Sequence, residues 1–148
     1  GKATGAHGAA VCGSEILKEY LINYSRQFIY TTALPYHSIA SIQNALEYRK
    51  HHPELWEKLK DNIELFRSNL HPSIPKLDSF HPVQGIIWDS SENTIEFSKY
   101  LNELGFDIRP ILSPTVPKGK ERVRICLHAF NSEEEITNLC HRINQYFQ

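Results

Sequence analysis

The sequence predicts an α+β fold in which helices pack on a small sheet. Apolar residues recur every three or four positions in several segments, which predicts helices, and one segment near the C-terminus alternates between apolar and polar residues, which predicts a strand. The 148 residues are enough for one domain, or for one and a fraction. From residue 36 to residue 148 the expected order is helix, helix, strand, helix, strand, strand, helix.

Residues 1–35 are expected to be the remnant of a larger domain, because one strand cannot form a sheet. Small residues fill positions 1–13, which predicts a tight loop leading into a short buried strand. Ser14 is expected to start a helix, with an apolar stripe of Ile16, Leu17, Tyr20, Leu21 and Tyr24. Residues 28–32 are β-branched and aromatic, which indicates a strand or extended loop ending at Pro35.

Two helices are expected after this boundary. The first covers about residues 39–48, and the second opens at Pro53, since proline suits the first turn of a helix. The second carries an apolar stripe of Leu55, Trp56, Leu59, Ile63, Phe66 and Leu70. A strand over residues 83–88 and a helix over residues 92–104 follow, and Gly105 is expected to stop that helix.

The C-terminal region is predicted to hold two more strands and the last helix. Residues 106–112 form one strand, a proline-rich loop covers 113–119, and residues 122–130 form the other strand. The second strand alternates between an apolar face of Val123, Ile125 and Leu127 and a polar face of Arg122, Arg124, Cys126 and His128. Ser132 and Glu135 have the spacing of a capping box, which predicts the start of the last helix.

Composition excludes several classes of protein. With 41% hydrophobic and 22% charged residues, the chain has the composition of a soluble globular protein rather than a disordered tail or a coiled coil. Its net charge of −1 gives no basic patch for nucleic acid, and no apolar run could span a membrane. Three cysteines without a CxxC spacing argue against a disulfide framework and a zinc site. We therefore expect a reduced, cytoplasmic protein without a metal, and the absence of methionine suggests a processed or truncated piece.

Two basic residues could carry chemistry. Lys2 lies among small residues, where a desolvated lysine amine can act as a nucleophile in Schiff-base chemistry, although a lone lysine near a chain end is more often solvated. Arg124 lies on the polar face of its strand, where a guanidinium can bind a carboxylate through two parallel hydrogen bonds. Its alternative is a surface salt bridge, with Glu121 or with a residue of the last helix.

Several threonine hydroxyl groups are weaker candidates for ligand binding than these two basic residues. Thr31 and Thr32 could donate hydrogen bonds to a phosphate, or could simply stabilise an extended segment as β-branched residues do. The stiff loop 113–119, which contains Thr115, could form the wall of a pocket or be a plain connection.

Four motifs together resemble the α-oxoamine synthases, which are pyridoxal-phosphate enzymes of the aspartate aminotransferase fold. They are Gly-Lys-Ala-Thr-Gly-Ala-His-Gly-Ala-Ala-Val at residue 1, Phe-Ile-Tyr-Thr-Thr-Ala-Leu-Pro at residue 28, Ser-Pro-Thr-Val-Pro-Lys-Gly at residue 113 and Glu-Arg-Val-Arg-Ile at residue 121. The resemblance covers the whole chain. It implies the tail of the large cofactor-binding domain at 1–35, followed by a C-terminal small domain at 36–148 with a small, mainly antiparallel sheet.

The resemblance also implies roles for four residues. Lys2 would be the Schiff-base lysine for pyridoxal 5'-phosphate, and Thr31 would contact the phosphate of the cofactor held by the other subunit of a homodimer. Arg124 would bind the amino-acid carboxylate, and Thr115 would border the substrate. Many family members of the biotin pathway have an arginine where this chain has Leu112, and Arg109 lies three residues earlier.

The implied activity is the decarboxylating condensation of an amino acid with an acyl-CoA or an acyl carrier protein. L-Alanine and a pimeloyl thioester, as in biotin synthesis, are the expected substrates. Glycine with acetyl-CoA, serine with a long acyl-CoA, and an inert module without catalysis are the alternatives. Family subunits are more than twice as long and hold other cofactor contacts upstream of the lysine, so the chain by itself is expected to be inactive and to bind no cofactor.

Overall fold

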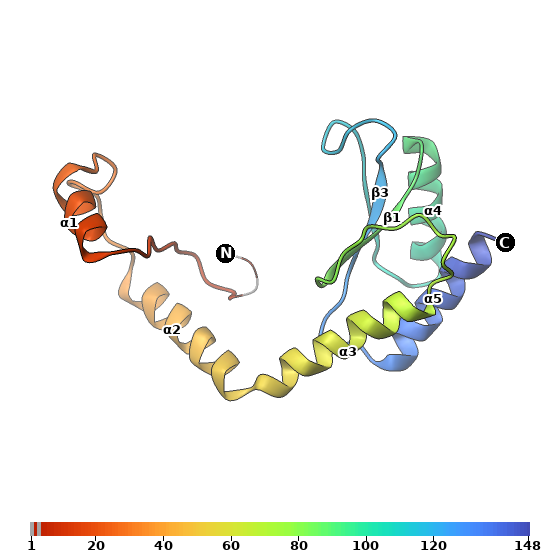
Figure 1. Cartoon of the computed structure of the whole chain (residues 1–148), viewed down its shortest axis with the longest axis horizontal. Helices are drawn as coiled ribbons and strands as arrows, with labels where there is room; N and C mark the ends of the chain where they lie inside the picture. The colour runs from red at the N-terminus through yellow and green to blue at the C-terminus, as the bar shows by residue number, and fades with distance from the viewer. Residues whose placement is uncertain (1, 3) are drawn as a thin grey trace. The chain divides into compact units, whose positions relative to one another are not determined.

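The computed structural model describes residue 2 and residues 4–148, and it divides into two compact units, Gly1–Pro53 (unit 1) and Glu54–Gln148 (unit 2). Figure 1 labels the helices and strands of both. The division of the parent protein into domains near residue 35 stays a prediction.

Unit 1 contains two helices that begin where the sequence gives start signals. Helix α1 spans Glu15–Tyr24, and the side chain of Ser14 caps it by accepting a hydrogen bond from the Leu17 N–H at 3.3 Å. Helix α2 spans Tyr36–His51 and begins directly after Pro35. Both helices were predicted, although α2 begins earlier than expected.

No strand forms in the described part of unit 1. The described residues among positions 1–13 have no regular structure, and Val11 is 76% exposed, so the prediction of a short buried strand there is wrong. Residues 26–30 form turns, with Tyr30 in the left-handed region at φ 62°. A strand needs hydrogen bonds to a neighbouring strand, and the described part of unit 1 offers no neighbouring strand. Gly1 and Ala3 of the predicted loop lie outside the described residues.

Low burial in unit 1 leads to a prediction about proteolysis. No described residue before Asn62 is buried, and aromatic side chains such as Tyr20 and Phe28 are more than half exposed. Segments with few buried contacts open at low cost in free energy. Brief digestion with chymotrypsin should therefore cut before about Ser38 and leave a product that contains unit 2, as mass spectrometry would show. A first cut inside unit 2 would contradict this expectation.

The sheet of unit 2 has three antiparallel strands in the order β1-β3-β2, as the fold prediction required. Strand β1 spans Val83–Ile87, β2 spans Arg109–Ile111 and β3 spans Arg122–Cys126. All three lie inside the predicted segments, but they are shorter. Strand β2 is an edge strand, which tolerates Pro110 because its missing N–H costs the sheet no central hydrogen bond.

Three helices cover one face of this sheet. They are α3 at Pro53–Asn69, α4 at Ser91–Glu103 and α5 at Glu133–Tyr146 (Figure 1). Phe66 of α3, Phe97 of α4 and Ile143 of α5 are at most 1% exposed and belong to one core cluster with Val123 of β3. Ser132 and Glu135 form the predicted capping box, and Gly105 at φ +92° follows the end of α4.

The three cysteines differ in exposure, which leads to a prediction about their reactivity. Cys140 is buried in the core, and this burial raises the pKa of its thiol to about 12, whereas Cys12 and Cys126 are exposed. The thiolate is the reactive form. At pH 8 we expect Cys140 to react with iodoacetamide at least about tenfold more slowly than the other two. Equal rates in the folded chain would contradict this, and the difference should vanish in denaturant.

Candidate functional site

One face of the sheet is free of the helices, and Arg124 lies in its middle. In β3 the buried Val123 and Ile125 alternate with the exposed Arg124 and Cys126, as the sequence pattern predicted. We call the side of the sheet that carries Arg124 and Cys126 the open face. Arg124 is on the central strand, so residues of both neighbouring strands surround it.

Cross-strand pairing places four residues in a row on the open face. Arg124 pairs with Gly85 of β1 on one side and with Arg109 of β2 on the other. Leu77 continues the row, since its N–H donates to the Gly85 carbonyl at 2.9 Å. A Cβ atom at Gly85 would lie 2.9 Å from Leu77 Cδ1, so the missing side chain of Gly85 makes room for Leu77. Arg124 thus has an apolar neighbour on one side and a second guanidinium on the other.

The guanidinium of Arg124 makes no hydrogen bond or ion pair within residues 2 and 4–148. The two other arginines of the open face are engaged. Arg122 Nε donates to the Lys120 carbonyl at 3.0 Å, and Arg109 Nε lies 3.0 Å from Asp107 Oδ1. Arg124 is therefore free to bind an external carboxylate through two parallel hydrogen bonds.

Glu121, the residue considered as a salt-bridge partner of Arg124, is instead buried at 1% exposure. Its Oε2 accepts a hydrogen bond from the Gly119 N–H at 2.7 Å, and its Oε1 lies 3.5 Å from the Ser91 hydroxyl. The carboxylate therefore joins the end of the loop 113–119 to the first residue of α4. No other side chain of the described chain places a carboxylate so deeply in unit 2.

Thr115 lies in this loop, between the edge strand and the central strand. Its side chain is exposed, and the loop is closed at its ends by hydrogen bonds from Val116 N–H to Leu112 O at 3.2 Å and from Lys120 N–H to Pro117 O at 3.0 Å. The peptide bond between Ser113 and Pro114 is cis. Glu121 and these bonds hold Thr115 at the same end of the sheet as Arg122.

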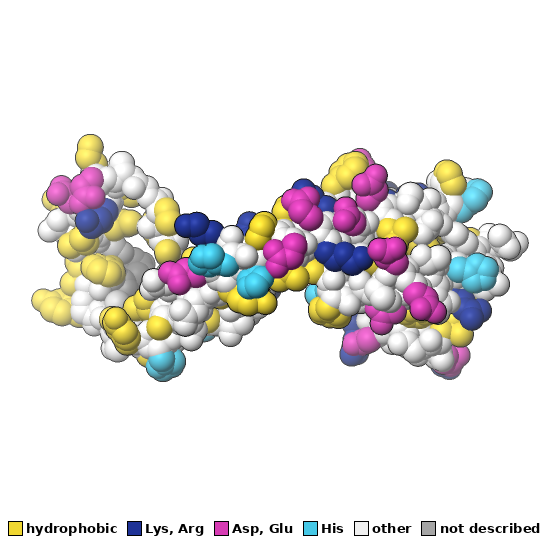
Figure 2. Space-filling view, turned by 90° about the horizontal axis from the view of Figure 1, so that it is seen from below, with side chains coloured by type: hydrophobic (Ala, Val, Ile, Leu, Met, Phe, Trp, Pro, Cys, Tyr) yellow, Lys and Arg dark blue, Asp and Glu magenta, His cyan; other side chains and the backbone are white. Residues whose placement is uncertain are grey.

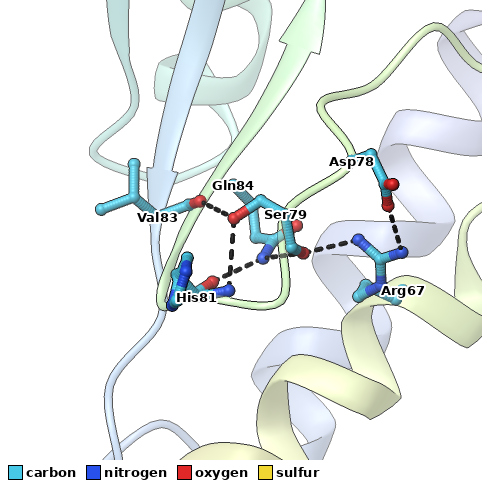
Figure 3. A network of polar contacts seen from close by, with 6 residues as sticks. All are labelled: Arg67, Asp78, Ser79, His81, Val83 and Gln84. Carbon is cyan, nitrogen blue, oxygen red and sulfur yellow. Dashed lines mark hydrogen bonds and ion pairs between the residues drawn. The ribbon is translucent and has the colours of Figure 1, made fainter.

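A polar network fixes the segment that leads into β1 (Figure 3). Arg67 of α3 donates to the Ser79 carbonyl and lies 3.1 Å from Asp78 Oδ1, and its guanidinium stacks 4.0 Å above the Phe80 ring. Gln84 donates to the carbonyls of His81 at 2.6 Å and Ser79 at 3.0 Å. This network attaches the segment after Leu77 to helix α3, and so it supports the apolar end of the row on the open face.

Lys2 and Thr31 lie in unit 1, and both are exposed. The carbonyl of Lys2 accepts a hydrogen bond from the Gly5 N–H at 2.9 Å, and Gly5 adopts a φ of +64°. The residues that follow Lys2 in the sequence have small side chains. The Thr31 N–H donates to the Phe28 carbonyl at 3.2 Å, and the Thr31 hydroxyl makes no hydrogen bond with a described residue.

These residues fit the groups of pyridoxal phosphate in their chemistry. A primary amine in a turn of small residues can form a covalent bond with an aldehyde carbon, and an exposed threonine hydroxyl can donate a hydrogen bond to a phosphate. The exposed amine of Lys2 and the free hydroxyl of Thr31 are both accessible for this.

Other kinds of site find little support in the part of the chain that the structure describes. It contains no group of three or more His, Cys, Asp or Glu side chains that could hold a metal ion. None of its helices has both the length and the apolar character needed to cross a membrane. On the face that Figure 2 displays, acidic and basic side chains of unit 2 are interspersed and do not separate into patches of one sign.

Comparison with known proteins gives a consistent result. Residues 1–143 match the family model of aminotransferase class I and II. The chain is 37% identical to an 8-amino-7-oxononanoate synthase of Emericella nidulans, covering 100% of this chain and 38% of that protein. It is also 37% identical to the enzyme of that name from Methylococcus capsulatus, covering 94% of this chain and 36% of the relative.

Solved structures agree with the fold. The crystal structure of 8-amino-7-oxononanoate synthase from Francisella tularensis has a TM-score of 0.79 and 26% identity, covering 99% of this chain and 43% of that one. A serine palmitoyltransferase of Sphingomonas wittichii has a TM-score of 0.65 at 17% identity, covering 86% of this chain and 33% of that one, which supports the fold alone. The chain thus spans well under half the length of the proteins that it matches.

Proposed function

Because the chain belongs to the family of class I and II aminotransferases, we propose that it is the C-terminal part of a pyridoxal-phosphate-dependent acyltransferase. The whole enzyme joins an amino acid to an acyl thioester, forming a carbon–carbon bond at the amino-acid Cα and releasing the thiol and carbon dioxide. L-Alanine and a pimeloyl thioester are the proposed substrates, and 8-amino-7-oxononanoate is the product. The printed names of the relatives and the four motifs support this choice.

The observation that carries the proposal is the free guanidinium of Arg124 on the open face. An arginine without a partner in the described chain, placed between an apolar side chain and a second arginine, suits the carboxylate of a small amino acid. Arg124 orients the amino acid by two hydrogen bonds, so it contributes to positioning rather than to bond making. Thr115, on the loop that Glu121 anchors, borders the same substrate.

Lys2 and Thr31 hold the cofactor in this proposal. Pyridoxal phosphate, when bound, supplies an electron sink for the negative charge that develops at the amino-acid Cα. The Lys2 amine would hold the cofactor covalently and would accept the proton from Cα as a general base. The Thr31 hydroxyl would donate a hydrogen bond to the phosphate of the cofactor held by the partner subunit of a homodimer. The proposed enzyme acts in the cytoplasm.

Two other functions compete with this proposal. The first is another α-oxoamine synthase, which would use glycine or serine in place of L-alanine. The likeness to serine palmitoyltransferase supports the fold alone and does not decide between these substrates. The second alternative is a folded module without catalysis.

The test uses the full-length parent protein with pyridoxal phosphate. Carbon dioxide release is measured with L-alanine, glycine or L-serine, each with pimeloyl-CoA, acetyl-CoA or palmitoyl-CoA. The proposal expects the fastest turnover with L-alanine and pimeloyl-CoA. A preference for glycine or serine would favour the first alternative, and no turnover with any pair would favour the second.

A further inference from the structure

Arg109 and Arg124 are direct partners across the β2–β3 pair. Directly opposed residues of antiparallel strands point to the same face of the sheet, with their Cβ atoms about 4.5–5.5 Å apart. Both side chains therefore leave the backbone on the open face, and both are exposed. Two guanidinium groups thus share one patch of surface.

Like charges placed directly opposite each other in a sheet are unfavourable unless an anion offsets them. One carboxylate is present, since Asp107 Oδ1 lies 3.0 Å from Arg109 Nε. The side chains of Arg109 and Asp107 are 70% and 77% exposed, and such a surface pair contributes little to stability. Because Arg124 has no partner in the described chain, the pair of arginines keeps an excess positive charge.

The ion pair with Asp107 also leaves part of Arg109 available. The distance to Asp107 is measured at Nε, and the two terminal Nη groups of Arg109 make no hydrogen bond with a described residue. A carboxylate has two oxygens with about four lone-pair sites, so it can accept hydrogen bonds from two guanidinium groups at once. An anion seated on Arg124 would lie within reach of these Nη groups.

We infer that Arg109 is a second substrate-binding residue, which shares the carboxylate of the amino-acid substrate with Arg124. This inference rests on the proposed function, in which Arg124 binds that carboxylate. Asp107 then has the role of orienting Arg109 by holding its Nε. The competing explanation is that Arg109 is a surface residue whose only partner is Asp107.

The experiment measures the Kd of L-alanine for the full-length, cofactor-loaded protein by calorimetry. The variants are Arg109→Gln, Arg124→Gln, the double variant and Arg122→Gln, which removes the open-face arginine that is held by a backbone carbonyl. Arg109→Gln should weaken binding by about threefold to tenfold, the size of one hydrogen bond at an exposed site. It should weaken binding less when Arg124 is already replaced, because both residues contact one carboxylate. Arg122→Gln should change the Kd by less than Arg109→Gln does.

Thermal unfolding of the same variants separates binding from structure. Because Arg109→Gln removes a like-charge neighbour of Arg124, it should leave the melting temperature unchanged or slightly raised. If Arg109→Gln leaves the Kd unchanged while Arg124→Gln weakens binding, the inference falls and the proposed function stands. If Arg124→Gln also has no effect, the proposed carboxylate site itself is wrong.

A second readout needs neither cofactor nor catalysis. Acetate is titrated into the 148-residue chain, and the NMR signals of the arginine Nε–Hε groups are followed. The signals of Arg109 and Arg124 should shift with one common Kd, and the Arg109 shift should vanish in Arg124→Gln. An Arg109 signal that does not move, or that moves unchanged in Arg124→Gln, would overturn the shared site.

Discussion

Replacing Glu121 with alanine is expected to lower the free energy of unfolding of the chain by about 1–3 kcal/mol. The substitution removes the acceptor of the Gly119 N–H, whose hydrogen bond to the carboxylate is 2.7 Å long, at a residue that is only 1% exposed. This hydrogen bond is partly buried, so the Gly119 N–H loses its acceptor and water replaces it only in part. Urea unfolding followed by tryptophan fluorescence reports this change, because Trp88 packs against Phe97 in the core at 5.2 Å between ring centroids.

Two variants serve as controls for this measurement. Glu121→Gln keeps a carbonyl oxygen that can accept from Gly119, so it should lose less stability than Glu121→Ala. Glu64→Ala, at an exposed position of α3, should change the free energy of unfolding by less than about 0.5 kcal/mol. An unchanged stability of Glu121→Ala would show that the loop 113–119 is held by other contacts.

The role of Glu121 could not be predicted from the sequence. A glutamate next to a strand is usually exposed, so an ion pair with Arg124 was one of the alternatives that the sequence left open. Its burial depends on two contacts from different parts of the chain, the Gly119 N–H and the Ser91 hydroxyl. Neither contact produces a periodic pattern in the sequence that would predict the burial of Glu121.

The exposed side of β3 could be predicted because a strand repeats every two residues. The apolar Val123 and Ile125 had to face the core, which placed Arg124 on the other side, and the structure agrees. The neighbours of Arg124 could not be predicted, because the register of β1 and β2 is set by the packing of the whole unit. This is why the pairing of Arg109 with Arg124 emerged only in three dimensions.

Residues 1–13 and 28–32 show the opposite case. The first segment was predicted to be a loop leading into a short strand and the second to be a strand or extended loop, but a strand forms only where another strand supplies hydrogen bonds. In the described part of unit 1 no such neighbour exists, so these segments form coil and turns. Local sequence patterns therefore predicted the helices of unit 1 correctly, whereas the short buried strand predicted before Ser14 does not form.

Replacing Arg124 with lysine in the full-length parent should weaken L-alanine binding by about tenfold to hundredfold, which corresponds to the roughly 1.5–3 kcal/mol of a charged hydrogen bond. Lysine keeps the positive charge but loses the planar pair of donors that matches a carboxylate. The fold should be unaffected, because Arg124 is exposed and makes no bond within the described chain. Equilibrium binding of L-alanine and thermal unfolding of the same samples would measure the two effects separately.

Arg122→Lys is the matched control, since both arginines lie on the same strand and the same face. The two Cα atoms are one strand repeat apart, about 7 Å, and Arg122 is held by the Lys120 carbonyl at 3.0 Å. Arg122→Lys should therefore weaken alanine binding much less than Arg124→Lys. If the two substitutions weaken binding equally, or if Arg124→Lys mainly lowers the melting temperature, Arg124 supports the fold and the substrate carboxylate binds elsewhere.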